Sequence, residues 1–288
     1  MIEAFEQYRP LMFSIAYRML GTASDAEDIV QEAFLRVQSA NAQEVQSPKA
    51  WLTTVVTRLC LDRLKSAREQ RETYIGPWLP EPILTSDEAP DAKAEMKESI
   101  SIAFLVLLEK LNPVERAVFL LREVFDYDYA EIAQFVDKSE SACRQIFHRA
   151  RQFIRANRPR LAPSKAAHTQ LLETFLWALH SGDLNSLTNL LHEDVVSYGD
   201  GGGKAFAART PIVGREKVLR FLLGLRKLAP EGFAASVEEI NGWPTFVMRV
   251  NGALFSVMSL ETDGEQVWAV RSVVNPDKLR NLNLRGLA

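Results

Sequence analysis

The stretch that decides the fold of the middle of the chain is YAEIAQFVDKSESACRQIFHRAR, from Tyr129 to Arg151. Apolar residues recur at helical spacing in and beyond its second half. They predict an inward face made of Cys143, Ile146, Phe147, Ala150, Phe153 and Ile154. A preceding amphipathic segment from Tyr129 to Phe135 and a short turn complete a predicted helix-turn-helix, a unit whose second helix enters the DNA major groove.

The polar side chains of the second helix fall on the opposite face. That face carries Ser141, Arg144, Gln145, His148 and Gln152, and its charge is extended by Arg149 and Arg151. Arginine can bond to guanine through two N–H groups and glutamine to adenine, so this face can read base edges as well as grip phosphates. From Lys138 to Arg160 seven Lys or Arg residues stand against the single acid Glu140. We therefore predict DNA binding rather than a merely solvated helix face.

Composition narrows the class of protein. The 288 residues are 47% hydrophobic and 25% charged, which is typical of a soluble protein of two or three domains. No apolar run is long enough for a bilayer, no signal peptide is recognisable, and neither Cys60 nor Cys143 lies in a CxxC pair. The four histidines lack ligand spacing, so we expect no metal, and we expect no cofactor. Two unpaired cysteines on apolar helix faces indicate reduced thiols and a cytoplasmic location. A net charge of −3 suits a subunit whose DNA binding depends on a larger partner.

Changes in composition and in hydrophobic periodicity divide the chain into five parts. We expect helical modules over residues 1–72 and 99–162, a Pro-rich linker over 73–98, an α+β domain over 166–276, and a tail over 277–288. In the first module, one helix should end near Leu20, Ser24 should cap a second, and Ser47-Pro48 should open a third.

Later turn and cap signals extend this reading. Asn112-Pro113 marks a helix start, and Ser181-Gly182 should end a helix that begins near Thr169. Beyond Leu191, alternating or β-branched segments predict four strands, at 195–198, 245–250, 254–260 and 267–274. The turn signals Asn251-Gly252 and Asp263-Gly264 between them predict a curved antiparallel sheet.

Residues Asp25 to Arg36, DAEDIVQEAFLR, carry a family resemblance. They resemble region 2 of extracytoplasmic-function (ECF) RNA polymerase sigma factors, and Tyr129 to Arg151 resembles region 4 of the same family. The resemblance implies that core RNA polymerase and promoter DNA are partners and that the chain is not an enzyme. Region 4 would read the minus-thirty-five element through the outward face given above. By resemblance, the polar ridge that docks on polymerase consists of Asp28, Gln31, Glu32 and Arg36.

The next helix resembles the part of region 2 that binds the minus-ten element. Its candidate DNA-binding residues are Arg58, Arg63, Lys65 and Arg68, beside a loop from Asn41 to Ser47 that would hold an unstacked base. Trp51 falls on the apolar stripe of Val55 and is expected in the core.

A second resemblance is carried by four segments: Ser181 to Leu184, Asp200 to Lys204, Pro211 to Arg215 and Val274 to Leu279. With these segments, residues 169–276 resemble a SnoaL-like domain, a cone in which a bent sheet wraps around helices and leaves a cavity. With the linker segment Gly76 to Pro82, they resemble the SigJ-like subgroup of these sigma factors. The resemblance implies that the extension sets the activity of the sigma modules in cis. Candidate contact residues are Trp78 and Pro80 in the linker and, in the domain, Asp200, Gly201, Gly202, Gly203, Lys204, Asn275, Pro276, Asp277 and Lys278.

We hypothesise that Gly76 to Pro82 packs near Asp200 to Lys204 and Asn275 to Leu279, because an apolar segment around Trp78 needs a surface to cover it. Two other functions stay open. One is a DNA-binding regulator that works alone and senses a small ligand in the cavity. The other is a cyclase or isomerase fused to a DNA-binding module, although an aspartate before glycines, as at Asp200, is most often a turn residue.

Overall fold

The chain is seen here as a computed structural model that describes residues 1–40, 45–85, 101–157 and 163–285, without the side chains of 67–72, 281 and 283–285. It separates into two compact units. The first contains residues 1–73, 87–98 and 104–158, and the second contains 74–86, 99–103 and 159–288. The linker residues 74–85 therefore cluster with the C-terminal domain and not with the helices that precede them.

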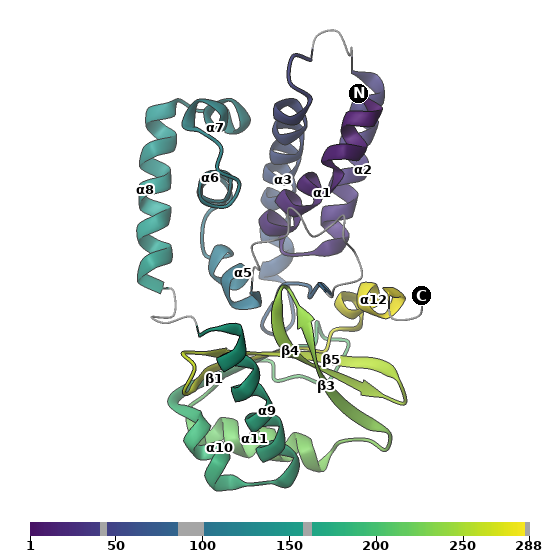
Figure 1. Cartoon of the computed structure of the whole chain (residues 1–288), viewed down its shortest axis with the longest axis vertical. Helices are drawn as coiled ribbons and strands as arrows, with labels where there is room; N and C mark the ends of the chain where they lie inside the picture. Colours follow the sequence, from purple (N-terminus) through teal and green to yellow (C-terminus); the bar gives the residue numbers. More distant parts are fainter. Residues whose placement is uncertain (41–44, 86–100, 158–162, 286–288) are drawn as a thin grey trace. The chain divides into compact units, whose positions relative to one another are not determined.

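The described part of the first unit is helical. Its helices are α1 (Ile2–Leu20), α2 (Ala23–Ser39), α3 (Pro48–Glu72), α5 (Ile102–Leu108), α6 (Pro113–Glu123), α7 (Tyr129–Val136) and α8 (Glu140–Asn157). Helices α1, α2 and α3 pack side by side, and α6, α7 and α8 pack around one another (Figure 1). In both groups each helix buries its apolar side chains against its neighbours and keeps most of its charged side chains exposed. Burial of these apolar faces stabilises both groups.

Local signals explain where these helices begin and end. Asn112 and Glu115 form a reciprocal capping box at the start of α6, as Asn112-Pro113 predicts. The cap predicted for α2 was wrong: the N-cap is Thr22, and Ser24 already lies inside the helix. Thr22 has an extended backbone, with φ −128° and ψ 136°, and its hydroxyl donates to Asp25 at 2.5 Å.

Buried polar contacts join the two groups of helices within the first unit. The Arg116 guanidinium is only 3% exposed, and it donates to the backbone oxygen of Met19 at 2.5 Å and to Glu109 at 2.6 Å. The hydroxyls of Thr53 and Tyr127 lie 2.8 Å apart and are also buried. Burying such groups is tolerated because they are hydrogen-bonded, so these contacts fix how α1 and α3 meet α6 and α7.

The second unit is an α+β domain. Its helices are α9 (Lys165–Ser181), α10 (Leu184–Leu190), α11 (Arg215–Lys227) and α12 (Pro276–Arg285). Its strands are β1 (Leu191–Asp200), β2 (Ile212–Val213), β3 (Phe233–Ile240), β4 (Trp243–Val250), β5 (Ala253–Thr262) and β6 (Val267–Val273). They form one sheet in the order β2-β1-β6-β5-β4-β3, in which β1 and β6 run parallel and the other neighbouring pairs run antiparallel.

The core of this unit lies between the sheet and the helices α9, α10 and α11 (Figure 1). Phe175 of α9 and Phe246 of β4 are fully enclosed there, with ring centroids 6.1 Å apart. Stacked aromatic rings of this size contribute much of the apolar area that such a core buries. Gly182 caps α9 with a left-handed backbone (φ 76°), as the sequence predicts.

Several elements of the second unit differ from the sequence prediction. Helices α10 and α11 and strands β2 and β3 were not predicted. Asn241-Gly242 after β3 adopts the same positive-φ turn as the predicted Asn251-Gly252. Helix α9 begins at Lys165, four residues before Thr169. Residues Pro276–Arg285 form helix α12, which packs on β5, where we expected a C-terminal tail. The predicted fold class, helical modules followed by an α+β domain with a mostly antiparallel sheet, is confirmed.

Candidate functional site

The second helix of the helix-turn-helix presents the polar face that the sequence predicts. Turn residues Asp137, Lys138 and Ser139 separate α7 from α8; Asp137 has a left-handed backbone, and the Ser139 hydroxyl accepts from the Ala142 amide at 3.2 Å. Of the predicted inward residues, Phe153 is only half-buried, and the others are buried: Cys143, Ile146, Phe147, Ala150 and Ile154. The candidate minus-thirty-five residues Ser141, Arg144, Gln145, His148 and Arg149 are exposed, and Arg151 is half-buried.

Neighbouring side chains hold several of these groups in place. The Arg144 guanidinium lies 3.2 Å from the Glu140 carboxylate, and its carbon lies 4.5 Å from the centre of the Tyr129 ring. Gln152 and His148 are joined by a hydrogen bond of 3.0 Å. The exposed edge of α8 is therefore a partly ordered row of donors and acceptors rather than a set of free side chains.

The ridge predicted to dock on polymerase is a continuous exposed face of α2. Asp28, Gln31, Glu32 and Arg36 are all exposed, and Arg36 pairs with Glu32 at 2.9 Å. The residues on the opposite face of the helix are buried. Leu35, which the sequence reading did not single out, lies on the exposed side with 63% of its surface accessible. An apolar side chain among charges is typical of the centre of a protein interface.

The candidate minus-ten residues of α3 have different surroundings. Arg63 bonds to Asp25 at 2.5 Å and Lys65 pairs with Asp62 at 2.8 Å, and all of these side chains keep solvent contact. Arg58 donates to the backbone oxygen of Gln134 in α7 at 3.1 Å. The side chain of Arg68 and the first residues of the predicted Asn41 to Ser47 loop lie outside the described residues.

A buried carboxylate, Asp200 at the end of β1, lies at the centre of the contact between the linker and the C-terminal domain. Its side chain is fully buried and accepts from the Tyr74 hydroxyl at 2.5 Å, from the Leu79 amide at 2.8 Å and from the Lys278 ammonium at 2.7 Å. Lys278 also donates to the backbone oxygen of Leu79 at 2.5 Å. One carboxylate and one ammonium therefore hold both the N–H and the C=O of a single linker residue.

Neighbouring groups complete this cluster, which we name the linker anchor: Tyr74, Leu79, Asp200, Asn275 and Lys278. The side-chain amide of Asn275 donates to the Tyr74 hydroxyl at 2.9 Å, and the backbone N–H of Asn275 donates to the backbone oxygen of Asp200 at 2.9 Å. Burial, followed by the hydrogen bond to Asp200, raises the pKa of Tyr74 above its ordinary value. The phenol therefore stays protonated and acts as a donor at neutral pH.

Other predicted contact residues surround the anchor. Trp78 is half-buried, and the Lys278 ammonium lies 4.2 Å from its ring centre, a cation–π geometry. Pro80 and Gly201 are buried, whereas Gly203, Pro276 and the pair Lys204–Asp277, joined at 2.5 Å, are exposed. Gly202 has φ +57°, and a Cβ there would collide with the Asn275 amide. Glycine is therefore required at this point of the predicted Asp200 to Lys204 loop.

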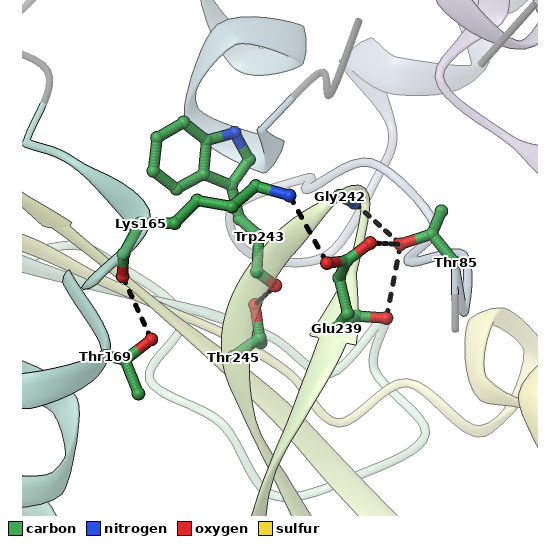
Figure 2. Close-up of polar contacts among 7 residues, drawn as sticks. All are labelled: Thr85, Lys165, Thr169, Glu239, Gly242, Trp243 and Thr245. Carbon is green, nitrogen blue, oxygen red and sulfur yellow. Dashed lines mark hydrogen bonds and ion pairs between the residues drawn. The ribbon is translucent and has the colours of Figure 1, made fainter. Parts of the chain in front are cut away.

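A second set of linker contacts lies at the edge of the sheet. Leu84 forms an antiparallel bridge with Ile240 of β3, the edge strand. Figure 2 shows the Thr85 hydroxyl between Glu239 and Gly242. The hydroxyl donates to the backbone oxygen and the carboxylate of Glu239 and accepts from the Gly242 amide at 2.7 Å. Lys165 at the start of α9 bonds to the same Glu239 at 3.3 Å. The linker thus supplies hydrogen-bond partners to backbone groups at the edge of the sheet, which would otherwise be open to pairing with another strand.

Sequence reasoning missed Tyr74 and the Thr85 contacts. Tyr74 precedes the segment that carries the family resemblance, and Thr85 binds β3, a strand that was not predicted. The Asn241-Gly242 turn could have located that strand. Among the described residues no group of three or more His, Cys, Asp or Glu side chains could hold a metal, and no described helix is long and apolar enough to cross a bilayer.

Comparison with known proteins identifies both helical modules. Residues 4–70 match Sigma-70 region 2, and residues 101–154 match Sigma-70 region 4. The ECF RNA polymerase sigma factor SigJ of Mycobacterium tuberculosis is 38% identical over 99% of this chain and 95% of its own length. Probable sigma factor SigI of the same species is 31% identical over 96% of this chain and 93% of its own.

Solved structures agree with these matches. The crystal structure of Mycobacterium tuberculosis SigJ covers 97% of this chain and 98% of its own, with a TM-score of 0.79 and 36% identity. An NTF2-like protein from Cytophaga hutchinsonii aligns with 42% of this chain and 99% of its own at 12% identity, with a TM-score of 0.29. The chain therefore belongs to the extracytoplasmic-function RNA polymerase sigma factors, transcription-initiation factors rather than enzymes.

Proposed function

We propose that this chain binds core RNA polymerase in the cytoplasm, directs it to specific promoters, and has its activity set in cis by the C-terminal domain through the linker anchor. The observation that carries the promoter-reading part is the exposed polar face of α8, which combines Arg144 and Gln145 on a helix whose other face is buried. Arginine and glutamine are the residues best suited to read guanine and adenine in the major groove.

The second helix of region 2, α2, supplies the polymerase contact. The ridge of Asp28, Gln31, Glu32 and Arg36 is solvent-exposed along α2, and Leu35 lies beside it. A charged rim around an apolar side chain is the composition expected of a protein interface, so we assign this ridge to the polymerase.

The minus-ten element is assigned to α3. Arg58 is exposed but bonded to the C-terminal carbonyls of α7, and Arg63 is bonded to Asp25. Exposed ion pairs and hydrogen bonds of this kind are weak and exchange readily with phosphate. We infer that Arg58 leaves the α7 carbonyls when promoter DNA binds.

Regulation in cis follows from where the linker is held. Residues 74–85 connect the two sigma regions, and they are bonded to the C-terminal domain through the linker anchor and the β3 edge. A free segment of this length could extend by up to about 40 Å, at about 3.4 Å per residue, whereas the docked segment keeps one fixed span. The distance that the two regions can span then depends on whether the linker is docked.

A transcription assay tests promoter reading. Run-off transcription with purified core polymerase should require this chain, and a gel shift of promoter duplex should require both proteins. The double substitution Arg144→Ala with Gln145→Ala should weaken selectivity at defined base pairs, by about 1 to 3 kcal/mol per bidentate contact. Arg155→Ala, an exposed cation further along the same helix, is the matched control for lost charge. A shift with this chain alone would instead support a regulator that needs no polymerase.

A reporter assay tests regulation. Trp78→Ala removes the ring that lies over Lys278, whereas Trp177→Ala removes a ring that is 61% exposed on α9 of the same unit. We expect Trp78→Ala to change promoter-reporter output and Trp177→Ala to leave it unchanged. Equal output from both variants and the unsubstituted chain would reject regulation through the linker.

A further inference from the structure

Tyr129, the first residue of α7, lies where three helices of region 4 meet. Its ring is half-buried and packs edge-on against Phe147 of α8, with centroids 6.0 Å apart and planes at 70°. The guanidinium carbon of Arg144 lies over the ring at 4.5 Å, and that of Arg122 in α6 lies at 5.4 Å. The ring thereby lines an open notch of about 360 Å³ together with both arginines and Glu140.

We propose that Tyr129 is a positioning residue for promoter recognition: its ring orders the Arg144 side chain so that the guanidinium N–H groups are presented to one base pair. This inference rests on the proposed reading of promoter DNA by α8. It adds a residue that is not on the reading face of α8 and that the candidate DNA-binding set does not contain.

The geometry favours the ring over the neighbouring carboxylate as the orienting group. Glu140 accepts a hydrogen bond from one terminal NH₂ group of Arg144, a group that a bidentate contact to guanine would use, so that pair must open when Arg144 binds a base. The Tyr129 ring lies against the guanidinium carbon and leaves the N–H edges free, so this contact can persist in the complex. Both Arg144 and Glu140 are at least half-exposed, which makes their ion pair easy to break and sensitive to salt.

The ring itself is held from two sides. Arg122 is fixed by a hydrogen bond of 2.9 Å to the backbone oxygen of Tyr127, and Phe147 is part of the buried face of α8. An arginine that is ordered before binding loses less side-chain entropy on docking than a free one. Tyr129 should therefore raise affinity for the correct base pair without adding a contact of its own.

The test uses the holoenzyme and a promoter library that is randomised across the minus-thirty-five element, with sequencing of the bound fraction. Arg144→Ala identifies the base pair whose preference depends on that arginine. Tyr129→Leu should relax preference at the same base pair by about two- to fivefold, the size of an exposed cation–π contact, and should leave other positions unchanged. Tyr129→Phe, which keeps the ring, should retain the preference of the unsubstituted chain.

The double variant Tyr129→Leu with Arg144→Ala should match Arg144→Ala alone, because the ring acts through the arginine. Full preference in Tyr129→Leu, or an equal loss at every position, would overturn the proposal. If Arg144→Ala itself alters no base preference, the reading of DNA by Arg144 fails and this inference fails with it. A loss in Tyr129→Leu that persists in the Arg144→Ala background would assign Tyr129 a direct or structural role and would also overturn it.

Discussion

Replacing Asp200 by asparagine should release the linker from the C-terminal domain. The carboxylate is fully buried and receives the Tyr74 hydroxyl, the Leu79 amide and the Lys278 ammonium. Asparagine keeps the shape but offers one accepting oxygen and turns an NH₂ group toward the remaining donors. Lys278, whose side chain is 9% exposed, would be left as a buried cation without its anion.

The expected magnitude follows from this loss. Removing one partner of a buried ion pair costs about 3 to 5 kcal/mol, and the retained oxygen places this substitution near the lower value. Since every 1.4 kcal/mol is about a factor of ten in an equilibrium constant, the linker should open about a hundred times more often. Adding Lys278→Met should recover part of the loss by removing the orphaned charge.

Hydrogen exchange of the full chain, read by mass spectrometry on a peptide that contains Leu79, measures this opening. Its amide is protected only while it donates to Asp200, so exchange should become about a hundredfold faster in Asp200→Asn. The control is Asp277→Asn, which alters an exposed pair with Lys204 and should change exchange little. Equal protection of Leu79 in the two variants would refute the assignment of Asp200 as the main holding group.

Three further predictions concern the same unit. Gly202→Ala should speed hydrogen exchange of the linker amides, because a Cβ would collide with Asn275 at a position with φ +57°. Gly224→Ala, where a Cβ meets open space on a helix, should leave that exchange unchanged. An equal response in the two variants would refute the steric argument. Burial lowers the pKa of His168 to about 4, so the unfolded chain binds a proton that the folded domain does not. Stability against urea should therefore fall by up to about 3 kcal/mol as pH drops from 6.5 toward 4, and His168→Phe should remove that slope. The raised pKa of Tyr74 means that the contribution of its hydroxyl to linker docking is complete below pH 10 and is lost as pH rises further. An ultraviolet titration of Tyr74→Phe should lack one phenol that ionises above the ordinary value, and an unchanged curve would contradict this.

Local sequence signals were sufficient to predict much of the fold. Asn112-Pro113 and Gly182 act over a few residues, where a cap or a left-handed turn satisfies backbone groups within one helix end. Strand β3 was missed because Ala234, Ala235 and the paired acids before Ile240 give no clear alternation. Such an edge strand is stabilised by its neighbour and by the linker, which no local pattern records.

The candidate site could be predicted only in part from the sequence, for a similar reason. Asp200 looks like a turn residue in the sequence, and its role as a buried acceptor depends on Tyr74 and Leu79, which are more than a hundred residues away. The exposed face of α8 was predictable because helical periodicity alone separates it from the buried face. The contact of Tyr129 with Arg144 depends on how α7 meets α8, which periodicity does not give.

Run-off transcription with core polymerase and the unsubstituted chain, Asp200→Asn or Asp277→Asn tests the central claim most directly. Core polymerase alone should give no specific transcript, and the chain should restore one. Asp200→Asn should alter its amount while Asp277→Asn should match the unsubstituted chain. If the chain never supports initiation, or if Asp200→Asn frees the linker and yields the same amount of transcript, the account is contradicted.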